Sequence, residues 1–375
     1  MQKQISFEVM SNVLRRELVS PNNPNLPLNK FIGNEEAIRR LSRAAFSAFG
    51  KDNHKCSDYS FALYGPPSTG KTYLAKLFAE TVDLPFVVIE PQMAKTTHDI
   101  FTEINSVLSS YEGRGVKKGE LSLYDYGDKN FICSPVIVFI DEVHNLKNSV
   151  VQGLLKATEP KDRLMVTEEG CKMNTSKICW MIATTDRGNL FDAFDTRFQK
   201  VSLRLYSKKE MSKIIKMNNP DWDDEICLLV ANYNAQVPRE AISFAKDMRV
   251  EQEMNPGSWQ DIARRVATDH SIDRFGMTNS RVEVLKALGQ NPMSASQLPF
   301  VVHVKEDELR KYIMPPLLTR TPDQTIPLVT VCSKGYVITK KGLEELDKRK
   351  ILNRGLNAIP ESVRFTFEAL ESEAA

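Results

Sequence analysis

The sequence lacks any long hydrophobic segment. None of its apolar stretches approaches the roughly 18 consecutive residues that indicate a membrane-spanning helix. The stretch from Met1 to Ser20 carries charged residues and has no apolar core, which excludes a secretory signal peptide. We therefore expect a cytoplasmic protein without membrane contact.

Disulfide and zinc patterns are also missing. The 6 cysteines include no Cys-x-x-Cys pair, and Cys133 and Cys179 lie in or beside apolar runs, as reduced thiols of cytosolic proteins commonly do. The 5 histidines show no His-Glu-x-x-His spacing, which argues against a protein-ligated zinc ion. A net charge of +2 excludes a general polycation, so a surface for nucleic acid must be a local patch.

Short apolar runs alternate with amphipathic helical stretches between about residues 29 and 206. Their near-continuous apolar character is typical of strands that are covered on both faces. It predicts an α/β fold with a parallel sheet flanked by helices. The runs are Phe61–Tyr64, Phe86–Ile89, Val136–Ile140, Ile178–Ala183 and Val201–Leu205.

The chain after residue 206 has a different sequence pattern. A helical pattern punctuated by Pro220 and Pro238 predicts a small helical domain. Two helical stretches (residues 281–288 and 306–313) then precede two β-like segments split by Ser333-Lys334-Gly335, the outline of a winged helix. The expected divisions are an N-terminal extension (1–28), a large α/β domain (29–206), a small helical lid domain (207–271), a winged helix (272–350) and a C-terminal tail (351–375).

A glycine-rich segment after the first apolar run fits the pattern G-x-x-x-x-G-K-[ST] without a mismatch. It opens a predicted helix, so backbone N–H groups and the helix N-terminus can both face a phosphate. Lys71 can reach the β- and γ-phosphates of ATP, and the Thr72 hydroxyl can ligate Mg²⁺. The expected nucleotide-binding residues here are Gly65, Pro66, Pro67, Ser68, Thr69, Gly70, Lys71 and Thr72.

Two carboxylates follow the apolar run Val136–Ile140, a Walker B pattern. Asp141 is expected to hold the Mg²⁺ shell, and Glu142 to orient or deprotonate the attacking water. Both carboxylates would lie at the carboxyl edge of the sheet, where ligands of open α/β sheets bind. The sequence therefore predicts ATP hydrolysis at this edge.

Polar and basic residues after the later strands complete the predicted site. Thr184 and Thr185 end the run beside the Asp141 strand, where a hydroxyl can contact the γ-phosphate or the attacking water. Arg197 lies where AAA+ proteins place an arginine finger that acts on the ATP of the neighbouring subunit. Pro238 suits the first turn of a helix and places Arg239 where it can swing onto the γ-phosphate.

The motifs, taken in order, resemble those of the RuvB family of AAA+ ATPases over about residues 29–346. Asp141-Glu142-Val143-His144 resembles the family's Asp-Glu-Ile-His box. Phe31 and Ile32 match the segment that lines the adenine, and Pro238-Arg239 matches sensor 2. The resemblance implies a hexameric ring around duplex DNA, in which ATP-driven domain rotation translocates the duplex and moves a Holliday junction.

RuvB-like proteins also carry a β-hairpin before sensor 1 that grips the junction-binding partner RuvA. Residues 163–177 occupy that place, with a shorter hairpin and a polar far arm, and could contact a RuvA-like protein. Two departures from the family are an insertion at residues 113–130 and the extra segments at both ends of the chain.

Duplex DNA is bound mainly through its phosphates, so lysine and arginine on a protruding hairpin are the expected contacts. Lys334 matches the basic wing position of the family. No base-reading residue stands out, so we expect sequence-independent binding to duplex or four-way junction DNA. The expected DNA-binding residues are Arg310, Lys311, Arg320, Lys334, Lys340 and Lys341.

Three functions fit these motifs. The preferred one is a ring-forming ATP-driven branch-migration motor that acts in recombination or repair. The first alternative is an AAA+ replication initiator or loader that uses ATP as an assembly switch. The second is a DNA-bound scaffold or regulator in which ATP only gates partner binding. Glu142 and Arg197 argue for hydrolysis, but they do not separate motor from switch.

Overall fold

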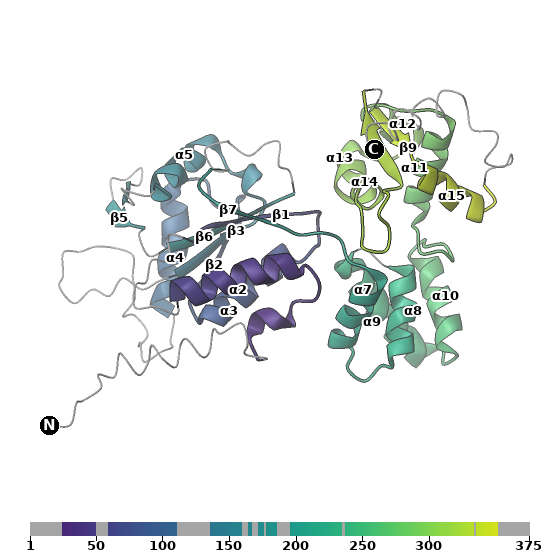
Figure 1. The fold of residues 1–375 in the computed structure, drawn as a ribbon, viewed down its shortest axis with the longest axis horizontal. Coiled ribbons are helices and arrows are strands. Elements are labelled where there is room, and N and C mark those ends of the chain that lie inside the picture. Colours follow the sequence, from purple (N-terminus) through teal and green to yellow (C-terminus); the bar gives the residue numbers. More distant parts are fainter. Residues whose placement is uncertain are drawn as a thin grey trace. The chain divides into compact units, whose positions relative to one another are not determined.

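The computed structural model describes residues 25–49, 59–110, 136–159, 164–166, 172–175, 178–185, 196–234, 237–333 and 335–351, whose fold is shown in Figure 1. The chain divides into two compact units. Unit 1 comprises the residues up to Gly65 and residues 70–203, and unit 2 comprises residues 66–69 and 204–375. Within the described ranges, no helix is both long and apolar enough to cross a membrane.

Unit 1 is built on a five-stranded parallel sheet with the strand order β2-β3-β6-β1-β7. Strands β1, β3 and β6 are buried along their whole length, as continuous apolar sequence requires when both faces are covered. The predicted α/β fold is thus confirmed. The strands are β1 (Phe61–Tyr64), β2 (Phe86–Ile89), β3 (Val136–Ile140), β6 (Ile178–Thr184) and β7 (Gln199–Ser202).

Strand β7 begins and ends earlier than its apolar run predicts. The sequence favours a strand over Val201–Leu205, but β7 spans Gln199–Ser202. Among the described residues, its strand partner is the four-residue β1, and the pairing runs from Phe61 with Gln199 to Tyr64 with Ser202. The partner's length, rather than the apolar pattern, therefore sets the bounds of this edge strand.

Helices cover both faces of the sheet and enclose two apolar layers. Ile137 and Phe139 of β3 face the layer formed with α2 and α3, whereas Val138 and Ile140 face the layer formed with α4 and α5. The alternation follows from the two-residue period of a strand. The helical elements of unit 1 are η1 (Pro27–Lys30), α2 (Glu35–Phe49), α3 (Lys71–Val82), α4 (Thr97–Ser110), η3 (Val143–Asn145) and α5 (Asn148–Ala157).

A small antiparallel hairpin precedes β6, where the sequence predicts one. Strands β4 (Leu164–Val166) and β5 (Lys172–Asn174) pair along their length. The hydroxyl of Thr175 donates a 2.8 Å hydrogen bond to the carbonyl oxygen of Ala157 at the end of α5, which fixes the base of the hairpin. The predicted turn at residues 168–170 lies outside the described residues, as does the insertion at 113–130.

Unit 2 begins with a bundle of helices at the position predicted for the small domain. The bundle consists of α7 (Lys208–Asn218), α8 (Asp224–Tyr233), α9 (Pro238–Met254) and α10 (Trp259–Asp269). Helix α7 starts with a capping box, in which Ser207 and Glu210 satisfy each other's backbone N–H groups. The capping box thus fixes the direction in which the chain enters α7.

The C-terminal part of unit 2 has its own apolar core, formed by helices and one hairpin. The two predicted helices and the two predicted strands are present. Short helices flank them, and α15 follows the hairpin directly. The elements are α11 (Asn279–Gln290), α12 (Leu298–Val301), α13 (Glu306–Glu308), η4 (Leu309–Ile313), α14 (Met314–Leu318), β8 (Val329–Cys332), β9 (Gly335–Ile338) and α15 (Lys340–Lys348).

The helix predicted for residues 306–313 continues to Leu318. A π-helical turn at Leu309–Ile313 lies in its middle, just before Pro315 and Pro316. Proline has no N–H to donate and its ring clashes with the preceding turn, so the helix widens there without ending.

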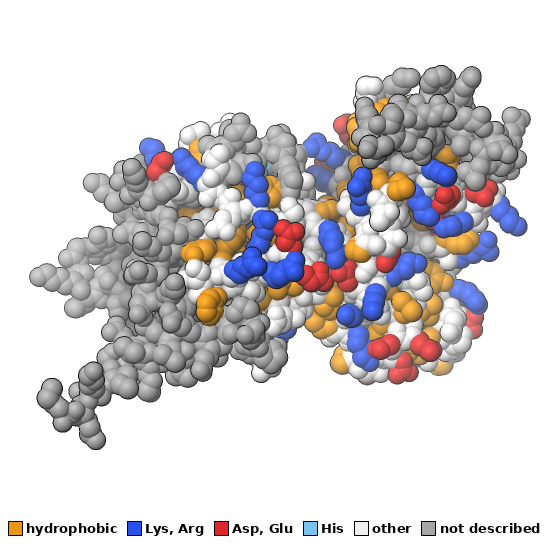
Figure 2. Space-filling model, viewed as in Figure 1, with side chains coloured by type: hydrophobic (Ala, Val, Ile, Leu, Met, Phe, Trp, Pro, Cys, Tyr) orange, Lys and Arg blue, Asp and Glu red, His pale blue; other side chains and the backbone are white. Residues whose placement is uncertain are grey.

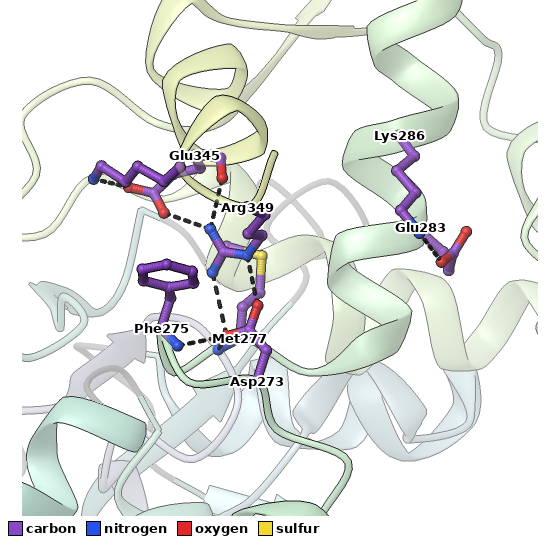
Figure 3. A network of polar contacts seen from close by, with 8 residues as sticks. Asp273, Phe275, Met277, Glu283, Lys286, Glu345 and Arg349 are labelled. Atoms are coloured by element: carbon purple, nitrogen blue, oxygen red, sulfur yellow. Dashed lines mark hydrogen bonds and ion pairs between the residues drawn. The ribbon is translucent and has the colours of Figure 1, made fainter. Parts of the chain in front are cut away.

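Polar contacts join the bundle to the C-terminal elements within unit 2. The guanidinium of Arg349, whose side chain is only 5% exposed, donates to Asp273 at 2.5 Å and to Glu345 at 2.8 Å. Figure 3 shows Arg349 between these two carboxylates, with the Phe275 ring beside it. Arg281 of α11 pairs with Glu240 of α9 at 3.2 Å. These contacts hold the two halves of unit 2 together.

Candidate functional site

The phosphate loop connects β1 to α3, as its sequence predicts. Gly70 caps α3 with φ +85°, a left-handed conformation that favours glycine, and Ser68 adopts φ +59°. The Thr69 hydroxyl donates a 2.8 Å hydrogen bond to the Pro66 carbonyl oxygen across the loop. A non-glycine residue at positive φ is costly, and such conformations cluster at binding sites. The backbone conformation and this hydrogen bond together define the shape of the loop.

Lys71 begins α3 and is only 6% exposed. Its ammonium group donates a 3.0 Å hydrogen bond to the Gly65 carbonyl oxygen across the mouth of the loop. Burial lowers the pKa of Lys71, while the nearby carboxylates of Glu142 and Asp141 oppose this shift. The cation thus lies inside the loop, where the sequence places it.

Thr72 and Asp141 meet at the carboxyl edge of the sheet. The Thr72 hydroxyl donates to a carboxylate oxygen of Asp141 at 2.9 Å, and the other oxygen of Asp141 accepts the Glu142 N–H at 3.0 Å. A hydroxyl and a carboxylate oxygen at one point are the ligand types that Mg²⁺ prefers, with its remaining positions left to water and phosphate. The two residues fit the predicted Mg²⁺ site.

Glu142 is held by the neighbouring strand. Its Oε2 accepts the Thr185 N–H at 3.1 Å and the Thr185 hydroxyl at 3.0 Å. Glu142 also adopts φ +47°, a conformation that is rare for residues other than glycine. The contacts follow from the parallel pairing of β3 with β6, which brings the ends of both strands to one edge. The geometry holds the Glu142 carboxylate in a defined position.

The two threonines that the sequence could not tell apart have different surroundings. Thr184 is 2% exposed, and its hydroxyl lies 2.8 Å from Nδ1 of His144, whereas Thr185 is exposed and contacts Glu142. The same His144 nitrogen lies 3.4 Å from Glu142. We did not predict His144 as a site residue. Its signal in the sequence is its place in the segment Asp141-Glu142-Val143-His144, which resembles the family's Asp-Glu-Ile-His box.

Arg197 lies at the opposite edge of the sheet. It precedes Gln199, which pairs with Phe61 at the start of β1, whereas the phosphate loop follows Tyr64 at the end of β1. At about 3.3 Å per residue, β1 separates the two ends by roughly 10 Å. The guanidinium donates to the Leu155 carbonyl oxygen and pairs with Glu159 at 3.3 Å.

Arg239 is exposed in the first turn of α9, after Pro238 at the first helical position. With Pro66, Pro67 and Ser68, which belong to the same unit, it lines a cavity of about 160 Å³. The Tyr206 hydroxyl donates a 2.8 Å hydrogen bond to the Thr69 carbonyl oxygen. The central residues of the phosphate loop therefore pack with the residues that contain the predicted sensor 2.

The two residues predicted to line the adenine follow η1. Phe31 is 5% exposed and belongs to the apolar core, with its ring stacked on Tyr73 at 6.1 Å between centroids. Ile32 is partly exposed. Of this pair, Ile32 has the more accessible side chain, and adenine binding by both residues stays a prediction.

Comparisons with known proteins identify a matching family model and similar chains. Residues 61–205 match the family model of the ATPase family associated with various cellular activities (AAA). A Holliday junction branch migration complex subunit RuvB from Mycoplasmopsis synoviae is 26% identical over 86% of this chain and 96% of its own length. The corresponding subunit of Mycoplasma pneumoniae is 21% identical over 88% of this chain and 98% of its own.

The chain is a divergent member of the RuvB family of AAA+ ATPases. The solved Thermotoga maritima RuvB Holliday junction branch migration motor shares its fold, with a TM-score of 0.61, 23% identity, and coverage of 88% of this chain and 98% of that one. As a RuvB-family AAA+ protein the chain binds nucleotide and is an ATPase. The phosphate loop, the acidic pair and the sensor strand remain the predicted residues of its nucleotide site.

The basic residues predicted to contact DNA lie on several elements of this RuvB-family chain. Arg310 and Lys311 are exposed on η4, and Arg320 is exposed after α14. Lys340 and Lys341 open α15 and do not belong to the wing; Lys341 pairs with Glu344 at 2.9 Å. Lys334, the remaining residue predicted to contact DNA, lies outside the described residues.

Proposed function

We propose that this chain is an ATP-dependent motor that translocates duplex DNA and drives branch migration of Holliday junctions. The relatives that carry this function in their names align with nearly their whole lengths. The observation that carries the hydrolysis step of this proposal is the Glu142 carboxylate, which Thr185 holds beside the Thr72–Asp141 pair. A protein that only gates partners with ATP has no need of a positioned base.

ATP binding is assigned to the residues of the phosphate loop. The backbone N–H groups of the loop and the start of α3 bind the phosphates, and Lys71 exchanges its hydrogen bond to Gly65 for phosphate oxygens. Thr72 and Asp141 hold Mg²⁺, which when bound neutralises charge that develops on the phosphates. Each residue acts from the position it already occupies.

Water activation is assigned to Glu142. The Glu142 carboxylate accepts two hydrogen bonds from Thr185, and a carboxylate held in this way can accept a proton from water. His144 lies between Glu142 and Thr184, so that it links the acidic pair to the sensor strand. We propose that Thr185 and His144 together hold the carboxylate at the angle that hydrolysis requires.

Hydrolysis between subunits is supported by the place of Arg197. The residue lies at the edge of the sheet opposite to its own phosphate loop, so we assign it to the ATP of a neighbouring copy. An arginine finger contributes about 10³- to 10⁵-fold in rate. This assignment requires an oligomer, and we propose the hexameric ring that the family resemblance implies.

DNA contact is assigned to unit 2. Figure 2 shows basic and acidic side chains interspersed on the visible face, which favours local phosphate contacts over one continuous basic field. Lys340 and Lys341 start a helix, where cations are electrostatically unfavourable but where a DNA phosphate would meet both the lysines and the helix N-terminus. The hairpin of β4 and β5 remains the proposed contact for a RuvA-like partner.

Turnover on a synthetic four-way junction tests the motor. With ATP, the full-length chain should convert the junction to duplex arms while hydrolysis continues, and the matched Lys71→Ala variant should do neither. Hydrolysis of about one ATP per binding event would indicate a loader that uses ATP as a switch. Stable junction binding without sustained hydrolysis would indicate a scaffold, and either result would contradict the proposal.

A further inference from the structure

The segment that joins the helix bundle to the C-terminal elements is folded on itself. This linker segment, residues 270–278, runs from the end of α10 to the start of α11, and an isolated β-bridge closes it. Inside it, one carboxylate oxygen of Asp273 accepts the N–H groups of Phe275 and Met277, at 2.8 and 3.0 Å. Because its backbone donors are satisfied internally, the linker segment has a defined shape, unlike a flexible linker.

Asp273 also connects the linker segment to the last part of the C-terminal elements. Arg349, which follows α15, donates to both carboxylate oxygens of Asp273, at 2.5 and 3.3 Å, and to the Glu345 carboxylate at 2.8 Å. Figure 3 shows its guanidinium between these two carboxylates, with the Phe275 ring beside it. A planar guanidinium that contacts a carboxylate at two points fixes the direction of the contact as well as its length.

Two further contacts join the C-terminal elements to the starts of bundle helices. Asp323, in the loop before β8, accepts the Lys208 N–H at 2.6 Å and so satisfies a free donor at the start of α7. A carboxylate in this place is also favoured by the helix dipole. Arg281 of α11 pairs with Glu240, in the first turn of α9, at 3.2 Å. The starts of α7 and α9 are thus both attached to the C-terminal elements.

The linker segment itself packs against the end of α8 through Gly276. This glycine has φ +80°, and a Cβ at its position would lie only 2.3 Å from the Asn232 carbonyl oxygen, so the close approach requires glycine. Helices α7, α8 and α9 pack against one another, and the starts of α7 and α9 lie at the same end of the bundle as the end of α8 (Figure 1). The C-terminal elements therefore meet the bundle at three points that do not lie on one line.

We propose that the bundle and the C-terminal elements move as one rigid lever, and that Arg349 is a positioning residue that holds the linker segment in place. The inference rests on the proposed motor function. Arg239, the predicted sensor 2, directly precedes Glu240, the partner of Arg281. A shift of the start of α9 on loss of the γ-phosphate is then passed straight to α11 and to the basic residues beyond it, because tightly packed contacts transmit small displacements.

Distances between two spin labels test the rigidity without reference to motor activity. One label replaces Glu253 near the end of α9 and the other replaces Gln290 at the end of α11, and both side chains are exposed. Genetically encoded labels avoid the native cysteines, and dilution with unlabelled protein removes distances between copies. The full-length chain should give one narrow distance distribution with the same mean alone, with a non-hydrolysable ATP analogue, and with analogue and junction DNA. A shifted mean or a second distance in any of these states overturns the proposal.

Arg349→Met tests the positioning residue, with Lys286→Met as its control. Lys286 pairs with Glu283 within α11, so this change removes an ion pair of the C-terminal elements and leaves their contacts with the bundle intact (Figure 3). Arg349→Met should broaden the distance distribution, and Arg349→Lys, which keeps the charge but loses the planar two-point contact, should broaden it less. Equal distributions in Arg349→Met and Lys286→Met would exclude the role of Arg349. If Arg349→Met does not fold, Arg349→Lys is compared with the control instead.

Junction conversion measured against ATP consumed shows whether the lever transmits movement to DNA. Arg349→Met should retain ATP hydrolysis but move about fivefold fewer base pairs per ATP, whereas Lys286→Met should keep both rates. A merely structural role would lower hydrolysis and conversion together and leave their ratio unchanged, which would contradict the proposal. If the unchanged protein moves no junction, the proposed function fails, and the spin-label distances still decide whether the lever is rigid.

Discussion

At the scale of single residues, the proposed activation of water depends on the contact between Glu142 and Thr185. Glu142→Gln should keep ATP binding and lower kcat by about 10²- to 10⁴-fold, because an amide cannot accept the proton. Thr185→Val removes one of the two hydrogen bonds to the carboxylate and should give a smaller loss. Steady-state hydrolysis and binding of a fluorescent ATP analogue separate the two effects.

Exposed residues of α4 offer controls for this experiment. Glu103→Gln and Thr102→Val make the same chemical changes away from the site and should hydrolyse ATP normally. Undiminished turnover by Glu142→Gln would remove that residue from its assigned role. A loss of nucleotide affinity in Thr185→Val would instead indicate that its hydroxyl contacts phosphate.

The sequence predicts the residues of the site better than their contacts. The phosphate loop and Asp141 follow from a motif whose spacing is tied to its chemistry. The roles of Thr184 and Thr185 depend on the pairing of β3 with β6 and on which threonine is buried, which no local pattern contains. His144 was missed for the same reason, because its hydrogen-bond partner Thr184 comes from another strand.

At the scale of elements, the start of α7 depends on one carboxylate. Glu210 accepts two hydrogen bonds from Arg204, at 2.9 and 2.7 Å, and closes the capping box with Ser207. The hydrogen bonds from Arg204 lower the pKa of Glu210 to about 2, although burial opposes the shift. The ionised group is therefore stabilising above its ordinary pKa, and this contribution is lost as the pH falls from about 4.5 through about 2.

Glu210→Gln should lower the free energy of unfolding by about 1–3 kcal/mol at neutral pH. The difference from the unchanged protein should shrink as the pH falls below about 4.5, because Glu210 is then protonated in the unfolded chain, and it should vanish near pH 2, where the native carboxyl is protonated as well. Denaturant unfolding at several pH values measures both effects. The exposed Glu253→Gln is the matched control, and a pH-independent loss in Glu210→Gln would contradict the assignment.

Elements with a strong pattern are predictable, and elements set by their neighbours are not. The buried strands follow from their apolar runs, whereas the bounds of β7 follow from the length of β1. The extension of the helix beyond Ile313 crosses Pro315 and Pro316, which by themselves indicate a helix end. A π-helical turn accommodates the two prolines within the helix. The surrounding apolar core, which buries residues on both sides of this turn, stabilises the widened helix.

At the scale of the whole molecule, activity should depend on copies that complement each other. Arg197→Ala protein and Lys71→Ala protein should each hydrolyse ATP poorly, for lack of a finger and of a phosphate ligand respectively. A mixture of the two should regain part of the activity, because some interfaces combine an intact loop with an intact arginine. The rate measured against mixing ratio gives the result.

Glu159→Gln is the appropriate control, since it changes the partner of Arg197 but leaves the arginine itself in place. This variant should hydrolyse ATP without help from another. Full-rate hydrolysis by a dilute Arg197→Ala monomer, with no gain on mixing, would exclude catalysis between subunits.

The opposite placement of Arg197 and the phosphate loop on one parallel sheet also restricts the symmetry of assembly. A protomer with Arg197 at one edge of its sheet and the phosphate loop at the other has two different faces, a front and a back. Copies that meet one neighbour through each end of the sheet stack front to back in a heterologous interface, which closes into a cycle or grows into a filament. A two-fold pair would have to bring both ends of each sheet into one self-complementary interface before either arginine could reach the loop of the other copy.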